Sequence, residues 1–574
     1  MCAKEALRSE TATASTFIQV LAENLGHSDG GYTFIQEDGR EHFVSWSELS
    51  REAFCRGRRL LRSGLRKGDR IALILPEERE FVFTFLGAVS VGVVPVPLYP
   101  PMGFGKFEAY CEDAIHILRS AGAREVWMTR GLADLLDPLL RAVEGLRAVV
   151  SEEFFAEPMS ESAPQPEAIL PGDVMFLQFT SGSTAAPKGV RVTHASVLAN
   201  CAAIIDALQL EGGRDRGVSW LPLYHDMGLV GFVLAPLIAR CPVSFLPTLS
   251  FAFSPRIWLE TVSRHRATVT FAPNFGLALA VKHTSADDFQ LLDLSCLRVV
   301  GCGAEPNHPE TLRSFATHFA AAGLRPGVVA PCYGMAEATL AISLSENGAP
   351  FTPDVIQREP YHASGLAVPA SNAEPPGPQA VFVPCGRPLA GHRILIVDDE
   401  GNLLPDRHIG EVVFQGPSVA AGYHGDPEAT RRSFTADGLR TGDCGYLADG
   451  VLYVTGRKKD LLIVNGRNHD PQTVEWVAAE VPGLRKGNVV AFTRPGLATE
   501  EVVLVAELRT GDASAVARQV RGHIQTKLSL PVAEILLLAL GELPKTSSGK
   551  VKRTKTRQQY LDGVLRRGAL HQAN

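Results

Sequence analysis

A loop of hydroxyl groups, small residues and one lysine follows an apolar run, Val174–Phe179, that has the composition of a strand. The loop, Phe179–Val190, reads FTSGSTAAPKGV and contains Lys188. Backbone N–H groups and hydroxyls in such a loop can converge on phosphate oxygens, while the lysine adds a mobile positive charge. The loop is not a Walker A motif, because the glycine and lysine spacing of that motif does not fit it. Taken alone, it is equally typical of a flexible surface loop.

Two further motifs follow apolar runs and could border a nucleotide. Gly301–Pro306 comes directly after the predicted strand Leu297–Val300. Small residues just beyond the carboxyl end of a strand let a planar base approach, which is the usual ligand position in open α/β sheets. Tyr333–Leu340 places an aromatic ring close to Glu337. The ring could stack on a base and the acid could hold Mg²⁺. Each motif alone is weak, since a turn with a solvated acid has the same composition.

Clusters of polar and charged residues add to these candidates. His225 and Asp226 end a predicted strand. Such a pair is more often a structural contact, but His225 could gate a reaction centre or position a carboxylate. Asp443, after a predicted helix end, could accept both hydroxyls of a ribose, and Gly456–Asp460 has the composition of a hinge between domains. For these last two, a solvated turn is the simpler interpretation.

A second loop of hydroxyls, glycine and lysine lies near the C-terminus, at Leu543–Arg553. Alone it is typical of an exposed basic loop. Its lysine, Lys550, is far along the chain from Lys188. The two loops together suggest that two cations from two domains meet on one polyphosphate.

The overall composition limits the class of protein. A chain of 574 residues with 45% apolar and 21% charged residues is an ordinary globular protein, and it is too long for a single core. The net charge of −6 argues against nucleic-acid binding. Ten cysteines without a C-x-x-C pair or zinc-ligand spacing fit buried thiols in a reducing, cytoplasmic setting. The uncharged run Phe81–Gly105 is long enough to span a bilayer. Its glycines and prolines instead predict a buried helix, a buried strand and a turn, so we expect no membrane span.

The elements that must position these residues alternate between strands and amphipathic helices. This alternation predicts an α/β architecture with parallel sheets covered by helices. The predicted strands are Arg70–Leu75, Val91–Leu98, Glu125–Met128, Val174–Phe179, Val243–Leu246, Thr268–Phe271 and Leu297–Val300. The predicted helices are Trp46–Ser63, Phe107–Ala121 and Ala195–Leu208.

The pattern changes in the last part of the chain. Prolines in Glu346–Pro384 are expected to interrupt any regular element, which predicts a long irregular segment. The runs His392–Val397, Gly410–Gln415 and Val451–Val454 read as short strands joined by hairpin turns, which predicts a small β subdomain. From about Leu461 the chain alternates again and is long enough for a separate small domain.

Together and in this order, the motifs resemble those of the adenylate-forming superfamily of acyl-CoA synthetases, luciferases and peptide-synthetase adenylation domains. The resemblance covers essentially the whole chain. Within the superfamily the sequence looks most similar to the fatty acyl-AMP ligases. The features that carry this are Trp220–Pro222 before His225–Leu229, Ala336 in place of a usual threonine, Asn465–Asn468 followed by Pro471 and Gln472, and extra sequence after Leu340. The chain departs from that family at His469–Thr473 and at Gly276–Ala278.

The resemblance implies the adenylate-forming fold. Residues 1–459 would form an adenylation core of two helix-flanked sheets and a small β subdomain, with an insertion within about 346–384. Residues 460–574 would form a small, mobile α+β lid. Asp460 would be the hinge between them.

The resemblance also implies a reaction and its residues. A fatty or related carboxylic acid would react with ATP and Mg²⁺ to give acyl-AMP, and the acyl group would then pass to the phosphopantetheine thiol of a holo-acyl carrier protein. The implied catalytic residues are Lys550, His225 and Glu337, with Glu337 and Thr184 at the metal. The implied ATP-binding residues are Thr180, Ser181, Gly182, Ser183, Thr184, Lys188, Gly303, Ala304, Glu305, Pro306, Tyr333, Gly334, Met335, Ala336, Asp443 and Arg457. The implied acyl-pocket residues are Asn274, Phe275, Gly276 and Ala278.

Two other functions stay open at this stage. An acyl-CoA ligase would use free CoA as the second thiol, and the extra sequence argues against it because it should restrict the lid rotation that completes a CoA site. A binding module would keep the nucleotide site without chemistry. The presence of Lys550, Glu337 and Lys188 together argues against that second alternative. For Gly276 and Ala278, close packing of the helix is a simpler interpretation than a tunnel for the acyl chain.

Overall fold

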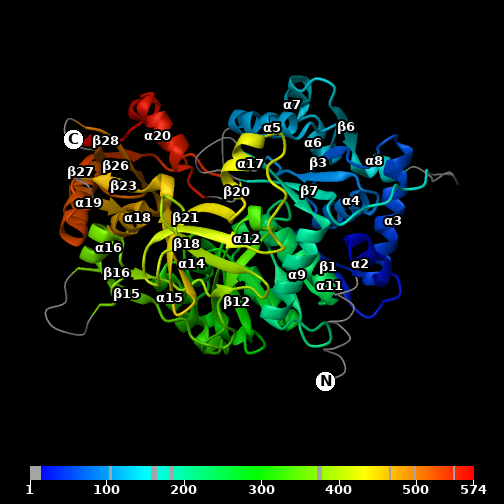
Figure 1. Cartoon of the computed structure of the whole chain (residues 1–574), viewed down its shortest axis with the longest axis horizontal. Helices are drawn as coiled ribbons and strands as arrows, with labels where there is room; N and C mark the ends of the chain where they lie inside the picture. The colour runs from blue at the N-terminus through cyan, green and yellow to red at the C-terminus, as the bar shows by residue number, and fades with distance from the viewer. Residues whose placement is uncertain are drawn as a thin grey trace.

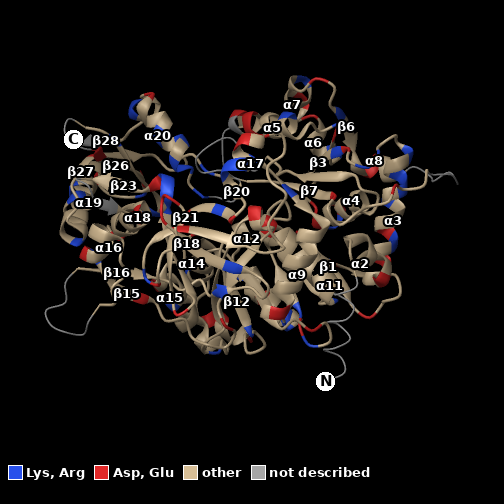
Figure 2. Cartoon of the chain, in the orientation of Figure 1, with Lys and Arg blue, Asp and Glu red and all other residues tan. Residues whose placement is uncertain are grey.

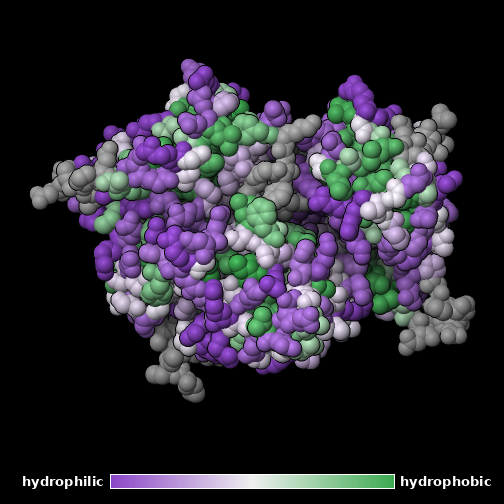
Figure 3. Space-filling model, turned by 180° about the vertical axis from the view of Figure 1, so that it is seen from behind, coloured by the Kyte–Doolittle hydropathy of each residue, from purple (hydrophilic) through white to green (hydrophobic). Residues whose placement is uncertain are grey.

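Two parts of unequal size make up the computed structural model, a large body coloured blue to yellow and a smaller C-terminal part in orange and red (Figure 1). The structure describes residues 14–101, 107–156, 164–180, 187–370, 378–464, 467–496, 500–546 and 550–573. Basic and acidic residues are interspersed over both parts (Figure 2), and so are apolar and polar residues on the face seen from behind (Figure 3). Among the described helices, none has the length and apolar character needed to cross a membrane.

The first sheet of the body is mostly parallel and carries the candidate site at one edge. In spatial order its described strands are β17 (Arg387–Pro388), β14 (Ala341–Leu344), β13 (Val329–Gly334), β12 (Val299–Cys302), β11 (Val269–Ala272), β9 (Gly217–Ser219), β10 (Val243–Phe245), β1 (Gly31–Ile35) and β2 (Glu41–Ser45). Neighbours from β13 to β1 pair in parallel, whereas β14, β17 and β2 are antiparallel additions at the edges. The loops after β9, β11, β12 and β13 therefore meet at the carboxyl ends of parallel strands, where ligands bind in open α/β sheets.

A second sheet packs beside the first and is parallel throughout, in the order β4 (Val94–Pro97), β3 (Arg70–Ile74), β5 (Glu125–Met128) and β6 (Arg147–Val150). An antiparallel pair, β7 (Val174–Phe179) and β8 (Gly189–Thr193), flanks the phosphate-loop candidate. Every residue of Phe81–Ser90 in α4 (Glu78–Ser90) is buried. The uncharged run is thus a buried helix followed by the buried strand β4, as predicted.

Helices cover both sheets, so the predicted α/β class is confirmed. One close crossing shows how tightly they pack, because a Cβ on Gly57 of α3 (Trp46–Arg62) would lie 2.8 Å from the carbonyl oxygen of Gly87 in α4. The other described helices of the body are α2 (Phe17–Asn24), α5 (Phe107–Ala121), α6 (Arg130–Ala133), α7 (Asp137–Ala142), α8 (Ser151–Ala156), α9 (His194–Leu208), α10 (Asp226–Gly228), the π-helix η1 (Leu229–Leu234), α11 (Ala235–Ala239), α12 (Thr248–Phe253), α13 (Arg256–His265), α14 (Asn274–His283), α15 (Pro309–Phe319) and the 3₁₀ turns η2 (Ala286–Leu291), η3 (Ala320–Ala322) and η4 (Ala336–Ala338).

The Pro-rich segment Glu346–Pro384 is more regular than predicted. It forms β15 (Asp354–Gln357), α16 (Arg358–Ser364) and β16 (Gln379–Phe382), with β15 and β16 paired antiparallel. The prediction that prolines interrupt every element is therefore wrong. Pro353 precedes β15 and Pro360 lies in the first turn of α16, where a missing N–H removes no helical hydrogen bond.

The predicted β subdomain is present as β18 (Arg393–Val397), β19 (Gly410–Gln415), β20 (Phe434–Thr435), β21 (Gly438–Ala448) and β22 (Val451–Arg457). One detail of the prediction is wrong: Asp443 does not follow a helix end but lies inside β21, since α17 (Pro427–Ser433) has already ended. Buried Leu439, Thr441 and Asp443 alternate with less buried residues in this segment, which is the two-residue period of a strand.

The C-terminal part, called the lid below, has its own sheet and its own buried core. The sheet order is β25 (Leu484–Pro495), β26 (Glu500–Leu508), β27 (Val532–Leu538) and β28 (His571–Ala573). The remaining described elements of the lid are the hairpin β23 (Leu462–Val464) and β24 (Arg467–His469) and the helices α18 (Pro471–Ala479), α19 (Ala513–Leu528), α20 (Arg553–Leu561) and α21 (Val564–Arg567). We place the boundary between body and lid in the 3₁₀ turn η5 (Lys458–Asp460), which joins β22 to β23.

Candidate functional site

The second lysine loop reaches from the lid into the body. Its base is a short hairpin in which the N–H of Thr546 donates to the carbonyl of Lys550 at 2.7 Å and Lys545 pairs with Val551. The Lys550 ammonium donates to the carbonyl oxygen of Ala304, in the turn after β12. Ala304 adopts a left-handed backbone conformation, with φ of 67°. The structure thus brings two predicted site residues together that are far apart in the sequence.

The negative charges of two carboxylates, Glu305 and Asp226, influence the pKa of Lys550. Burial lowers the pKa of Lys550, and Glu305 and Asp226 oppose that shift. Burial also raises the pKa of Glu305, whose Oε1 accepts a hydrogen bond from the backbone N–H of Phe275 at 2.6 Å. The nearby negative charges thus favour the protonated, cationic form of Lys550, which is the form that can stabilise an anionic substrate.

His225 and Asp226 form a contact on the same side of the site. The His225 Nδ1 and Asp226 Oδ1 atoms are 2.6 Å apart at the start of α10. Burial opposes ionisation of Asp226, but His225, the N–H of Met227 and the charge of Lys550 together keep its pKa below the ordinary value. The predicted His225 therefore contacts a carboxylate whose pKa is lowered in part by the charge of Lys550.

Asp443, Tyr333 and Arg457 form a second group in this region. The hydroxyl of Tyr333, at the end of β13, donates to Asp443 Oδ2 at 2.6 Å. The guanidinium of Arg457 lies 3.1 Å from Asp443 Oδ1. Burial raises the pKa of Tyr333 well above its usual range, so its hydroxyl stays a donor. Asp443 is thus a buried, oriented acceptor, the property that binding two hydroxyls requires.

A tyrosine that the sequence reasoning missed links two predicted site residues, Glu337 and Lys188. The hydroxyl of Tyr423 donates to Glu337 Oε1 at 2.8 Å. The ammonium of Lys188 lies 4.9 Å from the centre of the Tyr423 ring, within cation–π range. Tyr423 lies between Gly422 and His424, in a segment that pairs with β8. The sequence signal that could have identified it is an aromatic residue in a glycine-rich turn.

Glu337 can hold a magnesium ion in the way the sequence predicts. It is buried, burial raises the pKa of its carboxyl, and the Tyr423 hydroxyl counteracts that shift. Magnesium prefers oxygen ligands and usually takes only one or two carboxylates, the rest being water and substrate phosphate. A single carboxylate such as Glu337 would therefore share its ion with water and substrate phosphate.

The glycine-rich turns around Glu337 and Ala304 are closely packed. A Cβ on Gly303 would lie 2.6 Å from the Cys332 sulfur, and one on Gly334 would lie 2.0 Å from the Leu340 carbonyl oxygen. At Gly334 the clash is with the backbone, so only glycine fits there, whereas at Gly303 the Cys332 side chain would have to move. Met335 follows, with its N–H donating to Leu340 O at 2.8 Å. The other predicted residues of these turns, Pro306 and the buried Ala336, lie beside them.

The predicted acyl-pocket residues have different surroundings in the structure. A Cβ on Gly276 would lie 2.8 Å from the Trp220 ring, so close helix packing, the simpler interpretation, is confirmed at Gly276. The Asn274 side chain accepts a hydrogen bond from the N–H of His308 at 3.0 Å. Ala278, also on α14, is exposed, and its place in the acyl pocket stays a prediction. Phe275 and Gly276 stay in the proposed wall.

Part of the phosphate loop lies outside the described residues, namely Ser181, Gly182, Ser183 and Thr184. At the base of that loop, the N–H of Thr180 donates to the carbonyl of Lys188 at 3.0 Å. The predicted hinge residue Asp460 accepts a hydrogen bond from Arg553 at 2.6 Å. The hinge is thus connected to the helix that follows Lys550.

Comparison with known proteins decides the family. The sequence profile of the AMP-binding enzymes matches residues 26–424. The chain belongs to this family. The AMP-binding enzymes similar to it include a Caulobacter vibrioides protein whose provisional name is acyl-CoA synthetase, 38% identical over 91% of both chains. They also include the Moorena producens medium-chain-fatty-acid–[acyl-carrier-protein] ligase JamA, 31% identical over 96% of both chains.

A solved structure extends the comparison to the fold. It comes from a study of fatty acyl-adenylate ligases from E. coli and L. pneumophila, with a TM-score of 0.90 and 35% identity. The match covers 96% of this chain and 99% of that chain. The predicted adenylate-forming fold is therefore confirmed, with a large body and a small C-terminal domain.

Proposed function

We propose that this AMP-binding enzyme is a fatty acyl-AMP ligase. A carboxylate oxygen of a fatty or related acid attacks the α-phosphate of ATP, pyrophosphate leaves, and acyl-AMP remains. The phosphopantetheine thiol of an acyl carrier protein then attacks the acyl carbonyl, and AMP leaves. The observation that carries this proposal is the Lys550 ammonium, which reaches from the lid to the Ala304 carbonyl of the body. The names of the similar ligases support the acyl substrate and the carrier.

The site residues have separate tasks in acyl-AMP formation. Both reactants are anions, so the protein has to align them and neutralise charge, and alignment alone can supply roughly 7–11 kcal/mol. We assign Lys550 to the carboxylate and the α-phosphate, and Lys188 with Thr180 to the terminal phosphates. Asp443 and Arg457 take the ribose. The remaining assigned positions are Ser181, Gly182, Ser183 and Thr184 at the phosphates, Tyr333 and Gly303–Pro306 around the adenine, and His225 beside the carboxylate.

The magnesium ion, when bound, neutralises phosphate charge beside Glu337. Tyr423 orients that carboxylate and also contacts Lys188, so we expect Tyr423→Phe to weaken magnesium use. A lost hydrogen bond to a charged group predicts about a 10-fold higher magnesium concentration for half-maximal pyrophosphate exchange. Exchange rates measured over a magnesium titration test this. Tyr453→Phe is the control, because Tyr453 stacks on Tyr446 at 5.0 Å within the β subdomain. An unchanged magnesium requirement in Tyr423→Phe would contradict the assignment.

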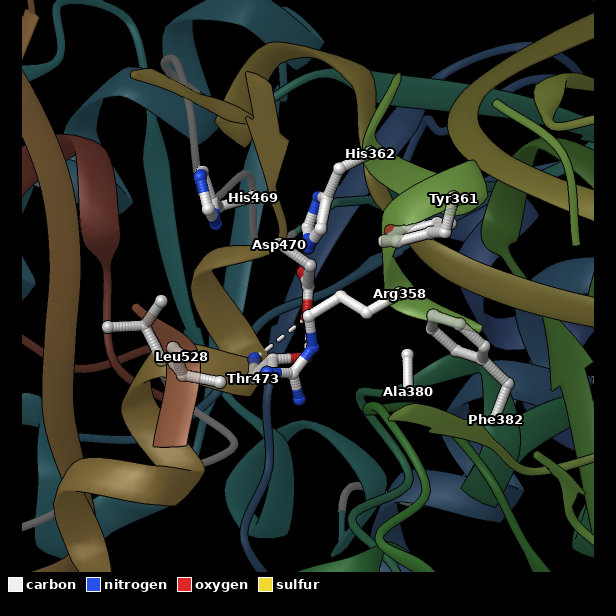
Figure 4. A pocket seen from close by; sticks show the side chains of 10 residues that line it. Arg358, Tyr361, His362, Ala380, Phe382, His469, Asp470, Thr473 and Leu528 are labelled. Carbon is white, nitrogen blue, oxygen red and sulfur yellow. Dashed lines mark hydrogen bonds between the residues drawn. The ribbon is translucent and has the colours of Figure 1, made fainter. Parts of the chain in front are cut away.

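The contact between the insertion and the lid favours a carrier protein over free CoA. Figure 4 shows Arg358, Tyr361 and His362 of the insertion beside His469 and Asp470 of the lid, around a small pocket. The rings of His362 and His469 have their centres 4.6 Å apart. The Arg358 guanidinium donates to the carbonyl of Lys527, at the end of α19, and to the carbonyl of Gln379, both at 2.6 Å. A cation at a helix C-terminus is favourable. This contact opposes the lid rotation that a CoA site would need.

Removal of that contact gives a direct test. We expect Arg358→Ala to raise acyl transfer to free CoA about 10-fold, because hydrogen bonds from a charged group hold the lid, while acyl-AMP formation changes less than about two-fold. Single-turnover transfer from preformed acyl-AMP measures the first quantity. Arg432→Ala is the matched control, since Arg432 pairs with Glu428 of its own helix at 2.9 Å. If transfer to CoA does not increase in Arg358→Ala, the insertion does not exclude CoA in this way.

One assay separates the proposed function from its alternatives. The protein is incubated with ATP, a panel of carboxylic acids, and either CoA or a holo-acyl carrier protein. Acyl-AMP with acyl-carrier product and no CoA ester supports the proposal. Rapid formation of the CoA ester identifies an acyl-CoA ligase, the activity in the provisional name of the Caulobacter relative. Absence of acyl-AMP with every acid identifies a binding module.

A further inference from the structure

A second contact joins the lid to the body, two residues beyond Lys550. The ammonium of Lys552 donates to Asp113 Oδ2 at 2.6 Å, and the two side chains are only 15% and 23% exposed. Asp113 belongs to α5 of the body, and Lys552 immediately precedes α20 of the lid. No motif of the sequence analysis includes Asp113, and none of the roles assigned above uses it.

The body holds Asp113 in one orientation. The hydroxyl of Tyr99 lies 3.3 Å from Asp113 Oδ2 and donates to it. The Tyr99 ring packs against the rings of Tyr110 and Tyr224, with centres 5.2 and 6.2 Å apart. Burial raises the pKa of Tyr99, so its hydroxyl remains a donor. Asp113 is thus anchored in an aromatic cluster whose last member, Tyr224, directly precedes His225 in the sequence.

Two backbone hydrogen bonds hold Lys552 within the lid. The N–H of Lys552 donates to the carbonyl of Pro544 at 2.8 Å, and the carbonyl of Lys552 accepts from the N–H of Thr556 at 2.9 Å. The first bond closes the hairpin that carries Lys550, and the second begins α20. A contact that fixes Lys552 therefore also fixes the position of the Lys550 ammonium.

We infer that Asp113 is a positioning residue that docks the lid for acyl-AMP formation through Lys552. The inference rests on the proposed function and deepens it. An exposed ion pair would contribute little, but this pair is mostly shielded and its acceptor is oriented by Tyr99. The neighbouring pair of Lys555 with Glu112, at 3.9 Å with Glu112 74% exposed, lacks both properties.

The test compares the two half-reactions. We expect Asp113→Asn to slow single-turnover acyl-AMP formation about 10-fold, the range of a charge-assisted hydrogen bond. Transfer from preformed acyl-AMP to the carrier thiol should stay within about two-fold, because that step does not need Lys550 at the phosphate. Glu112→Gln, one position away on the same helix, is the matched control and should leave both half-reactions unchanged.

A double-mutant cycle isolates the contact itself. Lys552→Met should slow acyl-AMP formation as much as Asp113→Asn, and the double variant should be no slower than either. Additive losses, equal losses in both half-reactions, or an unchanged Asp113→Asn enzyme would each overturn the inference. Hydrogen exchange of α5 and α20 gives a readout independent of activity, and it should rise in Asp113→Asn. If the wild-type protein forms no acyl-AMP, the proposed function fails, whereas the exchange result still decides whether Asp113 docks the lid.

Discussion

Replacement of Lys550 by alanine is expected to lower acyl-AMP formation by roughly 10²–10³-fold, because removal of one donor that stabilises developing charge costs about 2.7–4 kcal/mol. The structure supplies the physical reason. The Lys550 ammonium contacts the Ala304 carbonyl, and the charges of Glu305 and Asp226 favour its protonated form. Such a group stabilises charge without reorganisation at the moment of reaction. ATP–pyrophosphate exchange with a saturating acid measures the loss.

Two comparisons make the Lys550 result specific. Lys545→Ala, in the same hairpin, should keep at least half of the wild-type exchange rate. Transfer from preformed acyl-AMP should survive in Lys550→Ala, because the α-phosphate bond has already formed. Normal pyrophosphate exchange in Lys550→Ala would refute the assignment of this lysine.

Replacement of Arg553 by methionine is expected to destabilise the lid by about 3–5 kcal/mol, the usual effect of removing one partner from a buried ion pair. The Arg553 guanidinium donates to Asp460 at 2.6 Å and to Glu475 at 2.7 Å, and both carboxylates are less than one-tenth exposed. Methionine keeps much of the packing but leaves both acids without their cation. Denaturant unfolding followed by fluorescence measures this, and Trp476 is the tryptophan of the lid.

The loss of stability in Arg553→Met should depend on pH. Burial already raises the pKa of Glu475, and Arg553 opposes that shift, so the variant raises this pKa further. A carboxyl with a raised folded pKa favours the folded state most at low pH, and that contribution is lost as the pH rises through the folded value. The deficit in unfolding free energy should therefore be smaller at pH 5 than at pH 8. Arg557→Met is the control, since Arg557 donates to the Thr493 carbonyl and should cost about 1 kcal/mol. Equal stability of Arg553→Met and wild type would contradict the argument.

The regular parts of the fold could be predicted because apolar periodicity is a local property. Val174–Phe179 and Phe107–Ala121 are a strand and a helix with the predicted bounds. The motif-based interpretation was misleading at Asp443. Its polar neighbours suggested a turn, but buried and less buried residues alternate along β21, as they do in a strand. In the insertion, the prolines led to a prediction of irregular structure. Prolines at the ends of helices and strands do not prevent those elements from forming.

The candidate site could be predicted only as separate pieces. Motif order identified Lys550 and Ala304, but the contact between them spans 246 positions and depends on how the lid packs. Tyr423 and Asp113 carry no motif of their own. Their roles arise from neighbours brought by other strands and helices, Glu337 with Lys188 in one case and Lys552 with Tyr99 in the other.

The last strand of the lid has a practical consequence for work with this protein. β28 pairs antiparallel with β27, through His571–Ala573 against Ile535–Leu537. Deletion of these few terminal residues would expose the edge of an apolar strand, and exposed edges pair with other chains. A variant that lacks His571–Ala573 should therefore aggregate more readily than the wild-type protein.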